Sequence, residues 1–335
     1  MRSDTSAATA TTRVVLAALA GNLGIAVTKL LAFAATRSTA MLTEAVHSFV
    51  DTADQVLLLI GQKRADRAPD DSHPFGYGME IYFWGFIVAL MIFLAGGAFS
   101  VWQGVEKILH PAELDRPWIN LIVLAVSAVF EGTSFRVAYR EFRAVVRGKK
   151  VRGREIKFWR FLSISKDPGL YTTLLEDGAA LAGLGLAAIG VIGAGWLGLA
   201  WMDGAASAAI GLLLVAVALF MANETRSLIA GESAAEPIVE AARAAVEGDP
   251  RVLAIFDVAS LHLGPRNILL AVTLTFRHGL TGEDVQQAVD DLVARARASD
   301  PRICGVFIRP CSVDPRVSAP SAQPMAPAIR SGGRG

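Results

Sequence analysis

The chain has 335 residues, of which 53% are hydrophobic, and its mean hydropathy is +0.44. A water-soluble protein of this length rarely reaches such an average, so the composition favours a membrane protein. The formal net charge is only +1, which gives no sign of a nucleic-acid-binding chain. The first residues lack an apolar run followed by a small-residue cleavage site, so we expect no cleaved signal peptide.

Six stretches are apolar over the roughly 20 residues that a membrane helix needs. They are residues 14–35, 40–60, 81–101, 118–139, 170–192 and 201–220. Lysine and arginine are concentrated in the loops after the second and the fourth stretch, and such loops usually face the cytoplasm. We therefore expect a multi-pass protein of the cell (inner) membrane with both ends in the cytoplasm. The basic run between the fourth and fifth stretches is interpreted as an orientation signal rather than as a lipid-headgroup or nucleic-acid site.

The composition becomes that of a soluble domain after residue 228, and the predicted domains are residues 1–228, 233–312 and a disordered tail, 313–335. Helical periodicity in 237–246 and 281–298, with β-branched and apolar runs at 252–261, 268–276 and 303–308, predicts the order αββαβ. This order favours a small two-layer α+β domain. Cys304 and Cys311 match no zinc-ligand spacing and are expected to be reduced thiols.

Ionisable residues inside membrane spans are costly, so each is a candidate for function. The second span carries Glu44, His47, Asp51 and Asp54 at spacings that place them in one stripe of a helix. His47 and Asp51 lie one turn apart, which suits a tetrahedral divalent ion. A buried, hydrogen-bonded pair without metal is the alternative interpretation.

The other spans add fewer polar groups. Glu176 and Asp177 are adjacent in the fifth span and point about 100° apart, so one suits a metal ligand and the other a support or proton carrier. The fourth span carries Glu131. In the first span, Asn22 fits either the site or a helix–helix hydrogen bond, and Lys29 either reaches the membrane surface or forms a functional ion pair.

Four segments resemble the cation diffusion facilitator family. The stretch Ser38-Thr-Ala-Met-Leu-Thr-Glu-Ala-Val-His-Ser-Phe-Val-Asp51 resembles its second-helix signature, and His73-Pro-Phe-Gly-Tyr-Gly-Met-Glu80 resembles the motif before its third helix. Residues 174–183 are similar to the fifth-helix motif of one subgroup, and residues 263–265 with the following strand resemble its cytoplasmic domain. The resemblance covers residues 14–310.

This resemblance implies six membrane helices, a ferredoxin-like cytoplasmic domain and a homodimer. It assigns the transported metal to His47 and Asp51 on the second helix and to Asp177 on the fifth. The fourth position is Thr173, where many zinc carriers have histidine, so water or Glu176 would complete the shell. Supporting or proton-carrying roles are expected for Glu176 and for three further residues, Glu44, Glu131 and Asn22.

Two metal sites found in some relatives are not expected here. The loop after the second helix keeps Asp70, but Tyr77 replaces the histidine that would share its metal. The cytoplasmic domain has only His262 and His278, and Arg309 stands where its last strand would offer a ligand. We therefore expect no bound metal in the loop and no metal cluster in the domain.

The predicted function is proton-coupled antiport that exports a divalent transition metal from the cytoplasm. Zinc is the first candidate, and manganese, iron, cobalt and cadmium stay open because a site with few imidazoles favours harder ions. Two alternatives are a non-transporting scaffold or regulator and a membrane metalloenzyme. The enzyme is disfavoured because the sequence lacks an H-E-x-x-H motif and a nucleophile beside the site.

Overall fold

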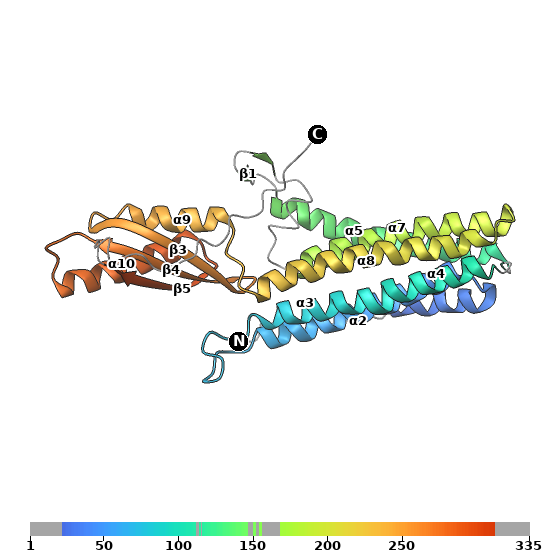
Figure 1. Cartoon of the computed structure of the whole chain (residues 1–335), viewed down its shortest axis with the longest axis horizontal. Helices are drawn as coiled ribbons and strands as arrows, with labels where there is room; N and C mark the ends of the chain where they lie inside the picture. Colours follow the sequence, from blue (N-terminus) through green and yellow to red (C-terminus); the bar gives the residue numbers. More distant parts are fainter. Residues whose placement is uncertain are drawn as a thin grey trace, which may run out of the picture. The chain divides into compact units, whose positions relative to one another are not determined.

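The computed structural model describes residues 22–111, 114, 116–146, 150–151, 154–155 and 168–311 (Figure 1). The predicted tail, residues 14–21 of the first predicted span and most of the basic run lie outside these ranges. The chain divides into two compact units, one of residues 1–231 with 263–265 and one of residues 232–262 with 266–335.

The first unit is a bundle of long helices. After helix Asn22–Thr36 follow α2 (Thr39–Ala65), α3 (Glu80–Met91), the π-helical turn η1 (Ile92–Ala98), α4 (Phe99–Leu109), α5 (Pro117–Val146), α7 (Pro168–Trp196) and α8 (Trp201–Ile229). α3, η1 and α4 form one continuous helix of 30 residues. A short antiparallel ladder joins β1 (Lys150–Val151) to β2 (Arg154–Glu155).

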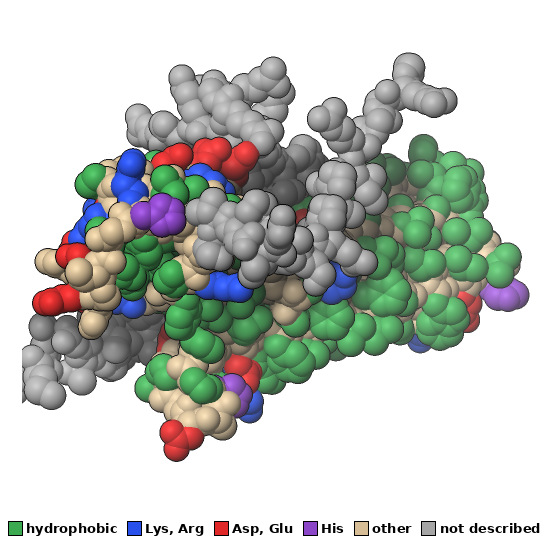
Figure 2. Space-filling view, turned by 60° about the vertical axis from the view of Figure 1, so that its left-hand side comes forward, with side chains coloured by type: hydrophobic (Ala, Val, Ile, Leu, Met, Phe, Trp, Pro, Cys, Tyr) green, Lys and Arg blue, Asp and Glu red, His purple; other side chains and the backbone are tan. Residues whose placement is uncertain are grey.

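Four helices in the described part of the chain are long and apolar enough to cross a membrane: Glu80–Leu109, Pro117–Arg140, Thr172–Trp196 and Trp201–Ile229. The second predicted span is also helical, as α2, but Glu44, Asp51 and Asp54 lower its hydropathy. The fifth span ends later than expected, because α7 continues beyond residue 192 to Trp196. Hydrophobic side chains dominate the visible surface of the helical unit, as contact with lipid requires (Figure 2).

The start of α2 is fixed by a carboxylate from α8. Arg37 adopts a positive φ of 57° and separates helix Asn22–Thr36 from α2, whose N-cap is Ser38. The fully buried Asp203 accepts hydrogen bonds from Ser38 Oγ (2.5 Å), Thr39 N (2.6 Å) and Thr39 Oγ1 (2.7 Å). An anion at a helix N-terminus satisfies free N–H groups and complements the helix dipole, so Asp203 holds this end of α2.

Glycines allow α8 to approach the continuous helix at the distance of backbone contact. A Cβ on Gly104 would overlap the backbone nitrogen of Ala208, and one on Gly211 would lie 2.6 Å from that of Val101. No side chain fits at either position, so these glycines set the distance between the two helices. The same helices carry much of the bundle core, including Ile92, Ile210 and Leu214.

The second unit contains α9 (Glu236–Glu247), β3 (Val252–Gly264), β4 (Asn267–Phe276), α10 (Gly282–Ser299) and β5 (Ile303–Pro310), in the predicted order αββαβ. The sheet order is β3-β4-β5, and β4 pairs in parallel with β5 after the crossover through α10. Thr281 and Asp284 form a capping box at the start of α10, and hydrogen bonds from Thr281 lower the pKa of Asp284. Apolar side chains of both helices and the sheet form its core, including Ile238, Ala242, Ile268, Leu274 and Leu292.

Candidate metal-transport site

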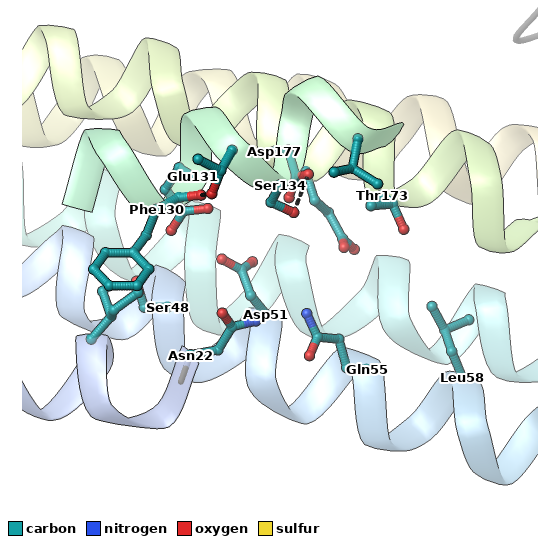
Figure 3. A pocket seen from close by; sticks show the side chains of 14 residues that line it. Asn22, Ser48, Asp51, Gln55, Leu58, Phe130, Glu131, Ser134, Thr173 and Asp177 are labelled. Atoms are coloured by element: carbon teal, nitrogen blue, oxygen red, sulfur yellow. Dashed lines mark hydrogen bonds between the residues drawn. The ribbon is translucent and has the colours of Figure 1, made fainter. Parts of the chain in front are cut away.

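A pocket of about 420 Å³ lies among four helices of the bundle. Its lining comes from helix Asn22–Thr36, α2, α5 and α7 and comprises Asn22, Ile25, Ser48, Asp51, Gln55, Leu58, Phe130, Glu131, Thr133, Ser134, Val137, Thr173, Glu176 and Asp177. Figure 3 shows Asp51 pointing from α2 into the space between the helices, across from Ser134 and Asp177. Four carboxyl groups from three helices thus border one cavity within the apolar bundle.

The pocket meets α2 along the stripe of Ser48, Asp51, Gln55 and Leu58, whose spacings of three and four residues are those of one helix face. The predicted stripe of Glu44, His47, Asp51 and Asp54 is rotated slightly from this face. Only Asp51 belongs to both. The pocket also extends along α2 from Ser48 toward the helix end at Ala65.

His47 lies behind Asp51, and its Nδ1 is 3.4 Å from Asp51 Oδ1. The imidazole is 1% exposed, and within the described residues neither ring nitrogen has a hydrogen-bond partner. Buried polar groups normally have a partner. The alternative of a pair without metal therefore leaves His47 unsatisfied, whereas a metal ligand would use one of these nitrogens.

The pocket side of α7 presents both acids and the threonine. Asp177 accepts a hydrogen bond of 2.7 Å from Ser134 Oγ of α5. Glu176 is 9% exposed, and its Oε1 is buried without a hydrogen-bond partner in the described structure. Thr173 lines the same cavity one turn earlier. Both acids therefore reach the pocket, although they are adjacent in sequence.

The described residues contain no group of three or more His, Cys, Asp or Glu side chains arranged to hold a metal ion. His47, Asp51 and Asp177 are thus gathered around one region but are not in one coordination shell. The cavity lies between Asp51 of α2 and the two acids of α7.

Lys29 forms an ion pair rather than reaching the membrane surface. Its Nζ lies 3.1 Å from Glu44 Oε2 and donates a 2.8 Å hydrogen bond to Ser48 Oγ. Both charged side chains are fully buried. Of the other predicted supporting residues, Asn22 and Glu131 line the pocket, whereas Glu44 does not.

Sequence reasoning gave no role to several residues that the structure brings to the site. Ser134 and Gln55 line the pocket, and the i+4 spacing of Gln55 from Asp51 was a usable signal. Asp54 belonged to the predicted stripe without a role, and both its carboxylate oxygens are buried without hydrogen-bond partners in the described ranges. Asp203 had no local signal, because its partners lie more than 160 residues earlier.

In the loop before α3, residues of the same loop donate hydrogen bonds to the carboxylate of Asp70. Tyr77 donates a 2.6 Å hydrogen bond to Asp70 Oδ2, and Ser72 Oγ and the backbone N–H of His73 donate to Oδ1. These bonds, with that of Tyr77 foremost, hold the pKa of Asp70 below its usual range. Tyr77 thus donates a hydrogen bond to the carboxylate that a metal bound in this loop would need.

The fold and the pocket define a multi-pass membrane protein with a carboxylate-lined cavity. The family model described as the cation efflux transmembrane domain matches residues 15–230. The chain belongs to the cation diffusion facilitator family, a family of transporters rather than enzymes. This membership leaves the membrane metalloenzyme without support.

Curated relatives are similar over most of this chain. It is 30% identical over 278 residues to a protein of Xenopus laevis named proton-coupled zinc antiporter SLC30A9, mitochondrial, covering 81% of this chain and 49% of the relative. The human protein of that name is 30% identical over 79% of this chain and 47% of its own length. Metal tolerance protein C4 of Arabidopsis thaliana is 29% identical over 71% of this chain and 51% of its own length. The chain thus spans about half the length of these relatives.

Proposed function

We propose that this chain is a proton-coupled antiporter that exports a divalent transition-metal cation, with zinc as the first candidate. The pocket carries this proposal, because it gathers Asp51, Glu131, Glu176 and Asp177 within an apolar helical bundle. Such a concentration of acid is unfavourable beside lipid unless cations or protons neutralise it. The names of the SLC30A9 relatives favour zinc and proton coupling.

In this proposal the metal binds between α2 and α7. Asp51 and His47 supply ligands from α2, and Asp177 supplies one from α7. Thr173 is a weak zinc ligand, so Glu176 or water completes the shell. Carboxylates and a single imidazole also accept harder ions, and manganese, iron, cobalt and cadmium therefore remain candidates.

We infer an alternating-access mechanism from the difference between the two ends of the pocket. The cavity extends toward the Ala65 end of α2, while buried hydrogen bonds lie toward the other end: Thr36–Asn120, Ser38–Asp203 and Thr43–Ser207. We place the Ala65 end in the cytoplasm, because Lys63 and Arg64 favour that side, and in this proposal the described arrangement is the inward-facing one. Metal binding requires deprotonated ligands, which couples metal release to proton uptake.

The proposed architecture is six membrane helices with both ends in the cytoplasm of a cell (inner) membrane. Residues 1–228 form the transport domain, and residues 233–312 form a ferredoxin-like domain through which two chains pair. The parallel β4–β5 pair and its α10 crossover support this domain fold. The predicted tail, 313–335, lies outside the described residues.

Metal flux tests the function directly. The purified full chain is reconstituted in proteoliposomes with a metal-sensitive dye inside, and a proton gradient is imposed. We expect uptake of zinc that fails when the gradient is collapsed, and a panel of zinc, manganese, iron, cobalt and cadmium ranks the substrates. Empty liposomes and the Asp51→Ala variant are the controls. Wild-type protein that moves none of the five metals would contradict transport and favour the scaffold.

A further inference from the structure

The buried pair of Lys29 and Glu44 lies directly beyond the pocket. Ser48 lines the pocket on the α2 side (Figure 3), and its Oγ accepts the 2.8 Å hydrogen bond from Lys29 Nζ. The same ammonium lies 3.1 Å from Glu44 Oε2. One serine therefore separates the open cavity from a fixed positive charge.

Glu44 is placed between three helices. It belongs to α2, Lys29 belongs to helix Asn22–Thr36, and a Cβ on Gly183 of α7 would lie 2.7 Å from Glu44 Oε1. Glycine at 183 thus provides the space for this carboxylate. Within the described structure, Glu44 Oε1 is buried without a hydrogen-bond partner, so Lys29 satisfies only one of the two oxygens.

The position of Glu44 along α2 shows where the Lys29–Glu44 pair lies relative to Asp51. Glu44 lies two helical turns before Asp51, on the opposite side of Asp51 from the pocket residues Gln55 and Leu58. His47 lies between them in sequence. Beyond Glu44, the Thr43–Ser207 hydrogen bond closes the helix contact. The pair therefore lies between Asp51 and the start of α2.

We propose that Glu44 is a second cation position on the transport route, occupied in this conformation by the Lys29 ammonium. A divalent cation from the pocket reaches the far end only after Lys29 leaves Glu44, so Lys29 is a tethered cation that closes the route. This inference rests on the proposed transport function. It assigns the Glu44 carboxylate to the transported metal rather than to helix packing alone.

Substitution of the lysine tests the second position. Lys29→Met leaves the Glu44 carboxylate free, and zinc is expected to fill it, which raises equilibrium zinc binding by about one ion per chain. Equilibrium dialysis of the purified full chain with radioactive zinc measures this stoichiometry. The double variant Lys29→Met/Glu44→Gln should return it to the wild-type value. Unchanged stoichiometry in a folded Lys29→Met protein would overturn the proposal.

The double variant also separates transport from packing. Replacing a buried ion pair by neutral side chains of similar size often preserves stability, so this variant remains testable if Lys29→Met alone does not fold. We expect its turnover in proteoliposomes to fall about tenfold or more while half-saturation by zinc changes by less than about threefold, because the pocket ligands remain. Lys107→Met, at a buried lysine of α4 outside the pocket lining, is the control and should keep wild-type turnover.

Two outcomes distinguish the proposals. A double variant that transports zinc at the wild-type rate would show that the pair only holds helices together, and the second cation position would be rejected while transport stands. A wild-type protein that neither binds nor moves zinc would reject the transport function, and the role of Glu44 would be rejected with it.

Discussion

The acidic side chains around the pocket differ in the residues that they contact. Asp177 is tied to α5 through Ser134, whereas Asp51 lies against His47 on its own helix. Glu176 has a buried oxygen without a hydrogen-bond partner among the described residues. An acid without fixed partners can adjust to an incoming cation at little cost, and an acid with a fixed hydrogen bond is already oriented. In the proposed site, Asp177 is therefore the oriented ligand on the α7 side, and Asp51 is its counterpart on α2.

The first prediction concerns these two ligands. Asp51→Ala and Asp177→Ala should each reduce zinc flux to the level of empty liposomes, because either change leaves an incomplete shell. The double variant should be no worse, since ligands that act as a unit give non-additive losses. Flux with an imposed proton gradient measures all three variants. Transport by Asp177→Ala at the wild-type rate would show that the α7 acid is not a ligand.

The second prediction concerns the loop before α3. Tyr77 now donates to Asp70, so Tyr77→His should remove this hydrogen bond and provide an imidazole beside the acid. We expect about one additional zinc ion bound per chain, because carboxylate and imidazole are both good zinc ligands. Equilibrium dialysis of the full chain detects it, with Tyr77→Phe as the control that adds no ligand. Asp70→Ala in the wild-type background should leave flux largely intact, and a loss as large as that of Asp51→Ala would contradict this assignment.

At the scale of the helices, the position of α2 depends on α8. The buried carboxylate of Asp203 accepts from the side chain and backbone of residues at the start of α2, and Thr43 is joined to Ser207 one turn later. These polar contacts connect the helix that carries His47 and Asp51 to a helix that carries none of the pocket residues.

The third prediction tests this anchor. Asp203→Ala should lower the free energy of unfolding by about 1–3 kcal/mol, because Ser38 and Thr39 lose a buried acceptor. Glu106→Ala, at an exposed acid of α4, should change it by less than about 0.5 kcal/mol. Thermal unfolding in detergent compares the two. Equal stability of both variants would show that α2 does not depend on the anchor.

The fourth prediction concerns the glycine contact between α4 and α8. A methyl group on Gly104 would collide with the backbone of α8, so Gly104→Ala should destabilise the protein by about 1–3 kcal/mol. A Cβ on Gly132 of α5 would have no neighbouring atom within 4 Å, and Gly132→Ala is the matched control with no loss expected. Both are measured by thermal unfolding in detergent. An unaffected Gly104→Ala protein would mean that the helices separate easily.

The sequence predicted the helices and strands better than the contacts between them. Hydropathy located the four described helices that are long and apolar enough to cross a membrane, and periodicity gave the αββαβ order, because both are local properties of the chain. The stripe on α2 was placed correctly in the helix, but its orientation was not predictable, since the direction of a face depends on neighbouring helices. An ion pair of Lys29 was one of two open alternatives, but Glu44 was not named as its partner, and the Asp203 anchor was missed for the same reason. The π-helical turn at residues 92–98 carries no proline or charge that would mark it.

At the scale of the whole molecule, the fifth prediction assigns bound metal to the helical unit. The second unit contains only two histidines, His262 and His278, and its described residues form no cluster of three metal ligands. The isolated segment 232–316 should therefore retain less than about one zinc ion per chain after dialysis, whereas the full chain should retain more. Elemental analysis of both proteins gives the values. A stoichiometric zinc ion in the segment would contradict the assignment.

The anchor at Asp203 also makes α2 a lever with a fixed pivot. Asp51 lies about 18 Å along the helix axis from Thr39, given the rise of an α-helix. A tilt of about 10° around the pivot would move this carboxylate by about 3 Å, which exceeds the roughly 2 Å length of a zinc–oxygen bond. The same tilt moves residues beside the pivot hardly at all. A small rotation of α2 around its start is thus sufficient to make or break the proposed metal shell, while the hydrogen bonds to Asp203 at the pivot are kept.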